Sequence, residues 1–267
     1  MKRLVIVVLA SILSMTVFAE GYQVNLLSTK QTGMGHVGTG MKLGAESMHF
    51  NPAGLVFLRT NMDFSLGISA IMAKAKYSYD GYSAKTDNPV GTPLYAYAGF
   101  KIYDNLAAGI SLTTPYGNSL KWPKNWAGAG LIQDISLKSY VIQPTLSYKI
   151  TDRLSIGVSL QLAWGNVNLS RALMGASDLQ GIGTKFESLL PLLAGVPSNI
   201  IPDEDKKAMQ EMVALMKGTE VPPAYARLEG NAHMRVGFNV GIMYDVCDKV
   251  TVGLSYRSKI KMRVKEG

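Results

Sequence analysis

The side chains that could bind a metal or catalyse a reaction are few in this chain of 267 residues. The histidines, His36, His49 and His233, are too widely spaced to form a metal-ligand motif, and the single Cys247 excludes an internal disulfide framework. No spacing of Ser, His and Asp, and no pair of carboxylates, has the pattern of a nucleophilic or acid–base site. We therefore expect no catalytic residue, no metal site and no enzymatic activity.

Gly33, Gly35 and Gly38 match the G-x-G-x-x-G pattern of dinucleotide-binding loops. That pattern binds a cofactor only where it follows a buried strand, opens a helix and precedes a strand with an acidic residue. Here residues 26–32 are polar, and an Asn-Pro turn follows soon after. We therefore interpret these glycines as flexible backbone packed inside a lumen, and we expect no cofactor.

The chain begins with an export signal. Lys2 and Arg3 precede an apolar run over residues 4–18, which ends in a small-residue cleavage site, so residues 1–19 are expected to be a cleaved signal peptide. No other apolar stretch reaches the roughly 18 residues that a membrane-spanning helix needs. The formal charge of +8 suits an anionic lipid surface and does not by itself indicate a nucleic-acid partner.

From Arg59 onward, apolar and polar residues alternate with the period of a β-strand. Residues 154–164 are the clearest case, with large apolar side chains at the even positions and mostly Ser, Gly or Gln at the odd ones. A soluble β-sandwich also alternates in this way. Long strands, inward positions rich in Gly, Ser and Thr, and an export signal favour an all-β fold, a transmembrane antiparallel β-barrel of the outer membrane.

A short repeat marks the hairpins of this barrel. Its copies begin at Asp104, Asp152 and Asp248, and each is an Asp-led turn that opens a strand. The turns at one end are short and the loops at the other end are long, as in outer-membrane barrels. We expect about seven strands, over residues 59–79, 94–103, 106–116, 136–150, 154–169, 233–245 and 250–265. Aromatic girdles are expected at Tyr103, Tyr148 and Tyr244, and at Tyr116, Tyr140, Trp164 and Tyr256.

The first of these strands should contain an irregularity. Its apolar residues change parity near residues 69–72, so that one extra residue is needed to keep them on the lipid-facing side. We therefore expect a β-bulge at this point.

The segment before the strands resembles a known family. A Gly-rich stretch over residues 33–40 is followed by Asn51-Pro52-Ala53-Gly54 and then by the first long strand. This order resembles the mature N-terminus of the FadL/TodX family of outer-membrane transporters for hydrophobic compounds. The resemblance implies that Asn51, Pro52, Ala53 and Gly54 form the turn of a hatch domain, residues 20–58, which plugs the barrel formed by residues 59–267.

The resemblance also implies a FadL-like barrel that is incomplete in this chain. A single-chain bacterial barrel closes with an even number of strands, and the family barrel is larger. The chain corresponds to the hatch and the first half of that barrel, so we expect a truncated or split reading frame. The missing C-terminal half of the barrel is then an expected partner, together with outer-membrane lipid.

Residues 171–230 interrupt the strands and are expected to form an external loop with helices. An apolar element ends at Pro197, and a second helix runs from Asp203 to Gly218 with apolar residues at i, i+3, i+4 and i+7. The two apolar faces cover either each other or a ligand. Methionine suits varied apolar ligands, and the family resemblance implies an entry site on such loops. The substrate-binding candidates are Phe186, Leu189, Leu190, Leu193, Met209, Met212, Val213 and Met216.

The strand from Val250 carries a row of basic residues on its inward or rim face. A solvated rim accounts for the outermost ones. Arg257 and Lys259 lie deeper, where they could pair with a substrate carboxylate.

These features predict passive uptake of long-chain fatty acids or other hydrophobic molecules, such as aromatic hydrocarbons, across the outer membrane. The substrate would pass from the external loop to the lumen, and the hatch would shift to open the path. A non-selective aqueous porin is one alternative. The other is a receptor for haem or haemin uptake, with His36 or His49 as an iron ligand.

Overall fold

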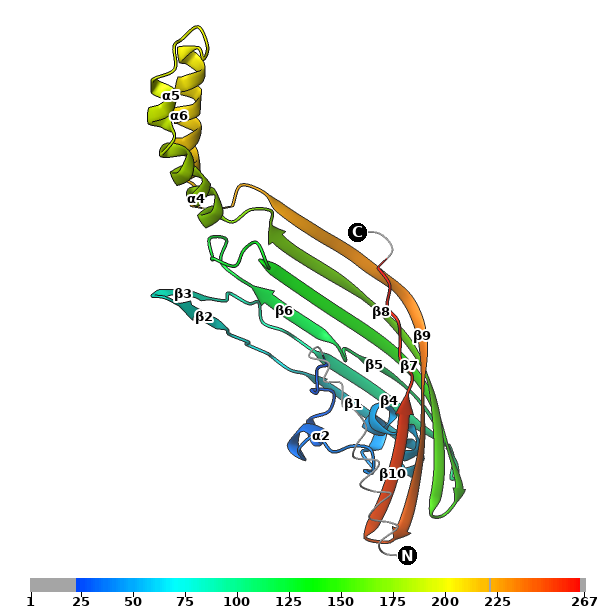
Figure 1. Ribbon diagram of the computed structural model, residues 1–267. Coiled ribbons are helices and arrows are strands. Elements are labelled where there is room, and N and C mark those ends of the chain that lie inside the picture. Colours follow the sequence, from blue (N-terminus) through cyan, green and yellow to red (C-terminus); the bar gives the residue numbers. More distant parts are fainter. Residues whose placement is uncertain (1–22, 221, 265–267) are drawn as a thin grey trace, which may run out of the picture.

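The computed structural model describes residues 23–220 and 222–264, so the expected signal peptide lies outside the described residues. One curved antiparallel sheet forms the body of the structure (Figure 1), which confirms the expected all-β class. Neighbouring strands follow the order β1-β4-β5-β7-β8-β9-β10. Their bounds are β1 Met62–Ile68, β4 Leu94–Tyr103, β5 Leu106–Thr113, β7 Asp134–Thr151, β8 Leu154–Ala172, β9 Tyr225–Cys247 and β10 Val250–Arg257.

Three short strands lie off this path. β6 (Gly117–Lys121) pairs with β7 beyond the end of β5, and β2 (Lys76–Tyr79) forms a separate hairpin with β3 (Tyr82–Lys85). In the described part of the chain, β1 and β10 each pair on one side only. The sheet therefore has two open edges.

The two faces of the sheet have opposite chemistry. Ile156 and Val158 on one face are 41% and 50% exposed, whereas Ser155 and Ser159 on the other face are 0% and 1% exposed. A soluble protein buries large apolar side chains and leaves polar ones in water. An apolar outer face on β7 to β10 therefore indicates contact with the hydrocarbon of a membrane. We call the face that carries Ser155 the inner face.

The two ends of the sheet also differ. Short turns join β4 to β5, β7 to β8 and β9 to β10 at one end, and at the other end a helical hairpin projects away from the strands (Figure 1). Its helices are α4 (Ala176–Glu187), α5 (Leu190–Ala194) and α6 (Asp203–Lys217). Helix α6 follows Pro202 and ends at Gly218, as predicted. None of the described helices is both long and apolar enough to cross a membrane.

Residues 23–58, which we call the plug, pack against the inner face (Figure 1). The plug contains α2 (Thr29–Gly33), η1 (Gly44–Glu46), α3 (Ser47–Phe50) and η2 (Pro52–Phe57). Met48 and Leu55 are fully buried, in one cluster with Tyr95 and Tyr97 of β4. Burying a side chain of this size contributes about 1.5–3 kcal/mol.

The glycine of the sequence repeat lies beneath the plug. A Cβ atom on Gly157 would lie 2.3 Å from the carbonyl carbon of Pro52, and one on Gly253 would lie 2.1 Å from the carbonyl oxygen of Thr39. Gly109 is covered by a side chain instead, since a Cβ atom there would lie 2.5 Å from Met48 Sδ. Only glycine allows another segment to approach a strand so closely. The repeat therefore marks the places where the plug touches the curved sheet β1–β10, which we call the wall.

The expected bulge at residues 69–72 is wrong. The bridge Ile71↔Gly91 keeps the register in which β1 pairs with β4. The pairing register shifts by one residue between the pairs Ile71↔Gly91 and Lys76↔Lys85. The extra residue lies in the second of the two paired segments, residues 85–91. Residues 72–79 are exposed on both faces, so burial does not constrain their parity.

Strand β10 ends at Arg257 and is therefore shorter than the expected range 250–265. Beyond Arg257 the continuous ladder stops: the Ile260 side chain lies over Gly237 on the inner face, and the bridge Val264↔Ala232 keeps the register of β10 with β9. With no described strand on its far side, this segment has only the edge of β9 to pair with.

Candidate functional site

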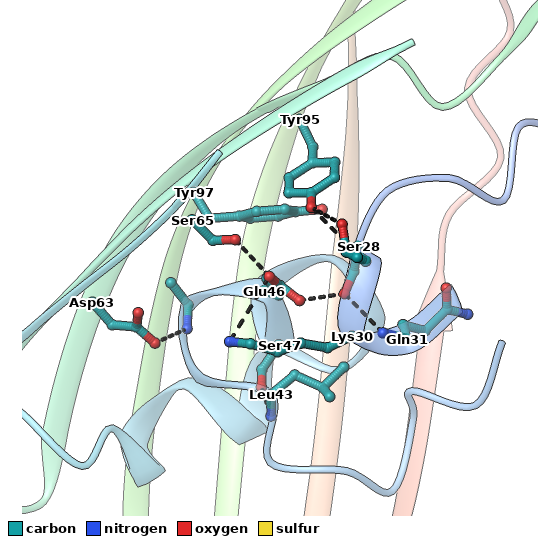
Figure 2. A network of polar contacts seen from close by, with 12 residues as sticks. Ser28, Lys30, Gln31, Leu43, Glu46, Ser47, Asp63, Ser65, Tyr95 and Tyr97 are labelled. Carbon is teal, nitrogen blue, oxygen red and sulfur yellow. Dashed lines mark hydrogen bonds and ion pairs between the residues drawn. The ribbon is translucent and has the colours of Figure 1, made fainter. Parts of the chain in front are cut away.

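Glu46 is a carboxylate buried between the plug and the wall, with 2% of its side chain exposed. Ser28 Oγ and Ser65 Oγ donate to its two oxygens, the latter at 2.5 Å, and Lys30 Nζ lies 3.9 Å away (Figure 2). Ser65 belongs to β1, and Ser28 caps α2. These hydrogen bonds compensate for the cost of burying a charge. Glu46 thereby connects α2, η1 and β1.

Two tyrosines of β4 hold the same N-terminal segment. The Tyr97 hydroxyl donates to the carbonyl of Leu27 at 2.8 Å, and the Tyr95 hydroxyl lies 2.7 Å from Thr29 Oγ1. Figure 2 shows both rings reaching from the sheet toward Ser28 and Glu46. Polar contacts therefore dominate the attachment of α2, whereas η1, α3 and η2 also have apolar packing against the sheet.

The four residues expected to form the hatch turn, Asn51-Pro52-Ala53-Gly54, lie buried together against the wall. Asn51 Nδ2 donates to the carbonyls of Thr39 at 2.8 Å and Ile242 at 3.1 Å. Its Oδ1 caps η2 by accepting from the backbone N–H of Ala53. The Ala53 carbonyl accepts from the hydroxyls of Ser147 and Ser155. This turn is the polar anchor of the plug on β7, β8 and β9.

Arg257, which was expected to face substrate, contacts the plug. Its guanidinium donates to the carbonyl of His49, and a second nitrogen lies 3.2 Å from His49 Nε2. Burial lowers the pKa of His49 well below its usual value, and the charge of Arg257 lowers it further. Arg257 Nε is buried without a hydrogen-bond partner among the described residues. Lys259 is exposed and lies beyond the end of β10, away from this contact.

The chemistry of the two faces inverts beyond Tyr140 and Trp164, whose stacked rings lie 5.8 Å apart on the outer face. Further toward the helical hairpin, the inner positions become apolar. Leu169 is paired with Ile135 on one side and Leu228 on the other. This inner apolar patch, which we call the vestibule, consists of Leu120, Ile135, Leu137, Val167, Leu169 and Leu228, and it adjoins the stacked rings of Trp122 and Trp126.

A gap in the sheet lies beside the vestibule. The last contact between β4 and β5 joins Leu94 to Thr114, and the chains meet again only where the backbone N–H of Asp87 donates to Lys121. Residues 89–93 and 115–120 share no backbone hydrogen bond across this gap, which we call the wall slit. The register with β7 shifts by one residue between β5 and β6, which indicates a bulge at residues 114–116.

The wall slit holds a cavity of about 280 Å³. Its lining includes Leu137 from the inner face and Tyr140 from the outer face, so the cavity spans the thickness of the sheet. Val24 of the plug also lines it, and the backbone N–H of Val24 donates to the carbonyl of Pro115 at 2.8 Å. The N-terminal segment of the plug therefore lies against the edge of the slit.

The external substrate candidates fall into two groups. Val213 is buried and Met216, Leu190 and Leu193 are half-buried, as mutual packing of the helices requires. Four side chains remain available to a ligand: Phe186 (52% exposed), Leu189 (47%), Met209 (38%) and Met212 (53%). The hairpin and β10, which ends at Arg257, lie far apart, so the structure does not bring these candidates into one site (Figure 1).

An apolar membrane-facing surface, a plug on the inner face and a vestibule beside a wall slit define a plugged sheet of the outer-membrane β-barrel type. Residues 10–267 match the family described as outer membrane protein transport protein (OMPP1/FadL/TodX), and the chain belongs to this family. The family consists of transport proteins of the outer membrane rather than enzymes.

Two relatives carry the name long-chain fatty acid transport protein. The one from Escherichia coli K12 is 25% identical over 264 residues, which are 97% of this chain and 56% of that protein. The one from Salmonella typhi is also 25% identical over 264 residues, which are 97% of this chain and 54% of that protein. The chain thus spans about half the length of these relatives.

Solved structures show the same fold. A FadL homologue from Pseudomonas aeruginosa superposes with a TM-score of 0.60 at 18% identity, over 90% of this chain and 53% of that chain. The toluene transporter TodX from P. putida superposes with a TM-score of 0.52 at 20% identity, over 82% of this chain and 52% of that chain. These likenesses confirm the expected barrel-type fold.

Sequence reasoning missed Glu46, the vestibule and the wall slit. Glu46 is the only acidic residue between Gly21 and Met62, and this isolation was a usable signal. Pro115 lies in a segment read as a strand, where proline favours an edge or a bulge. The contact of Arg257 with His49 had no such signal, since 208 residues separate the two.

Proposed function

We propose that this protein takes up long-chain fatty acids or similar hydrophobic molecules passively across the outer membrane. The observation that supports this most directly is the vestibule, an apolar inner surface that continues into the wall slit. Family membership and the names of the relatives point the same way. Transfer of apolar groups from water onto such a surface yields about 0.8 kcal/mol per buried CH₂, so no other energy source is needed for entry.

In this proposal, the exposed side chains Phe186, Leu189, Met209 and Met212 capture the molecule, and Leu190, Leu193, Val213 and Met216 hold the hairpin together. The molecule then crosses the vestibule and leaves through the wall slit once Val24 withdraws. A fatty-acid carboxylate that reaches Arg257 competes with His49 for the guanidinium and loosens the plug. Lys259 is the second candidate partner for that carboxylate.

The proposal also covers export and assembly. Residues 1–19 act as a signal peptide that is removed on the way to the outer membrane. The edges of β1 and β10 require a covering partner in lipid, because each unpaired backbone group there costs several kcal/mol. We assign this role to the missing C-terminal half of the barrel, whether it is encoded separately or follows in the same frame.

The test is uptake of a radiolabelled long-chain fatty acid by cells that lack their own transporter. Leu169→Asp places a hydrated charge in the middle of the half-buried vestibule and should reduce uptake about tenfold, since losing apolar contact with two CH₂ groups costs about 1.6 kcal/mol. Ser170→Asp, one residue further on the outer face, is the matched control and should leave uptake intact. Equal uptake by both variants, at equal amounts in the outer membrane, contradicts the proposed route.

The alternatives have their own signatures. A porin would swell liposomes in sugar solutions, and a haem receptor would shift the Soret band of haemin in a way that His49→Ala abolishes. No contact in the described residues favours either one.

A further inference from the structure

A polar groove lies on the outer face of the wall, beyond the stacked rings of Tyr140 and Trp164. It has a volume of about 460 Å³, and its lining alternates with that of the vestibule on the other side of the same strands. Val167 and Gly230 contribute to its lining, and the polar side chains that line it are Ser136, Lys138, Asn166, Asn168, Glu229, Asn231 and His233.

The depth of this groove identifies the layer of the membrane that it faces. Lys138 and Asn166 pair in register two residues beyond Tyr140 and Trp164, and Ser136 and Asn168 pair four residues beyond. At about 3.3 Å per residue and a strand tilt of about 35–45°, the groove lies roughly 5–10 Å outside the aromatic pair along the membrane normal. The headgroup layer is about 5–8 Å deep on each side, so the groove faces this layer and its outer end extends beyond it.

The groove also contains unused hydrogen-bonding capacity. Asn168 Oδ1 is buried without a partner among the described residues, and its Nδ2 donates to Glu229 at 3.2 Å. Glu229 is neutralised by an ion pair with Arg227. Lys138 is exposed and has no salt bridge in the described part of the chain, so the groove keeps one uncompensated positive charge.

We propose that this groove binds the phosphorylated sugar headgroup of an outer-leaflet glycolipid. The amides of Asn166, Asn168 and Asn231 provide donors and acceptors for sugar hydroxyls, and Lys138 pairs with a phosphate. The apolar outer face below the aromatic pair holds the acyl chains at the same time. The lipid thereby fixes the position of the wall beside the slit. This inference concerns the outer face; Lys138 also lines the cavity of the wall slit, so the test measures bound lipid rather than uptake.

The test uses the assembled protein purified from outer membranes, with bound lipid measured by native mass spectrometry. A purified phosphorylated glycolipid, the same lipid after enzymatic removal of its phosphates, and phosphatidylglycerol are titrated in parallel. Wild type should retain the phosphorylated glycolipid, and Lys138→Glu should bind it about tenfold more weakly, the effect of losing one charge-assisted contact. Lys185→Glu, on the distant helix α4, makes the same charge change and should bind as wild type does.

Hydrogen exchange on the wild-type protein provides a second measurement that needs no variant. Added glycolipid should protect residues 134–140 and 227–233 and leave the helical hairpin unchanged. Equal binding by wild type and Lys138→Glu overturns the proposal. Equal competition by phosphatidylglycerol overturns it as well, because the groove would then act only through unspecific charge.

Discussion

Oδ1 of Asn51 occupies the space that a side chain on Gly241 would need: a Cβ atom there would lie 2.0 Å from this oxygen. The same side chain donates to the carbonyl of Ile242, so the anchor of the plug depends on a bare backbone at this point of β9. The plug and the wall are therefore matched residue by residue.

Gly241→Ala should detach this anchor. Overpacking a tight contact costs about 1–3 kcal/mol, so the turn from Asn51 to Gly54 should become several-fold to a hundredfold more open. Limited proteolysis within residues 23–58 measures this opening. Gly91→Ala is the control, because its Cβ would meet nothing closer than 3.5 Å. Equal resistance of the two variants to protease would show that the anchor tolerates a side chain.

Glu46→Ala should release α2 from the wall. Ser28 and Ser65 lose their common acceptor, and hydrogen bonds to a charged group contribute about 1.5–3 kcal/mol. Hydrogen exchange of residues 27–33 should accelerate about tenfold or more, while the Met48 cluster stays protected. Glu211→Ala on exposed α6 is the control. Unchanged exchange in Glu46→Ala would mean that Tyr95 and Tyr97 hold α2 without help.

Acid should loosen the plug at His49. Its folded-state pKa is depressed, so its contribution to stability is complete above about pH 6.5 and is lost as the pH falls below that value toward the folded-state pKa. Each pH unit within that window costs about 1.4 kcal/mol. Protease sensitivity of residues 44–57 should thus rise between pH 7.5 and 5, and His49→Gln should remove this dependence. A profile that is identical in His49→Gln contradicts the assignment.

Met212→Asp should weaken uptake without disturbing insertion into the membrane. Met212 is 53% exposed on α6, so the charge remains in water and the helix stays folded. Val213→Asp, by contrast, places a charge in the buried seam with α4 and should unfold the hairpin. Uptake at low substrate concentration and circular dichroism separate the two effects. Normal uptake by Met212→Asp would leave the exposed residues of the hairpin without a role in capture.

Residues 1–267 expressed by themselves should not form a closed monomeric barrel. β1 and β10 each present an unpaired edge among the described residues, and roughly ten such backbone groups in hydrocarbon cost more than the 5–15 kcal/mol that stabilise a typical domain. The fragment should show no heat-dependent shift on gels, and co-expression with a second half-barrel should restore that shift. A protease-resistant, heat-modifiable monomer contradicts this expectation.

The sequence by itself determined the central parts of the seven main strands, their faces and helix α6, but not where every strand ends. The alternation over residues 154–164 determines which side chains face lipid, because strand periodicity is local. Asp152 favours a turn and Pro202 favours the start of helix α6, and both act only on the backbone next to them. The sequence also shows the hairpin repeat, but it does not show why each copy contains a glycine. The plug residue that covers Gly157, Pro52, lies about a hundred residues earlier in the sequence.

Only the tertiary structure decided how the plug, the vestibule and the slit fit together. Glu46 contacts Ser28 and Ser65, and Arg257 contacts His49, because the sheet curves around the plug. No local sequence pattern encodes that curvature. The wall slit depends on a shift of one residue between β5 and β6 against β7, and register between strands is set by pairing across the whole sheet. The predicted bulge at residues 69–72 was wrong because the alternation of apolar and polar residues indicates the strand register only where one face is buried.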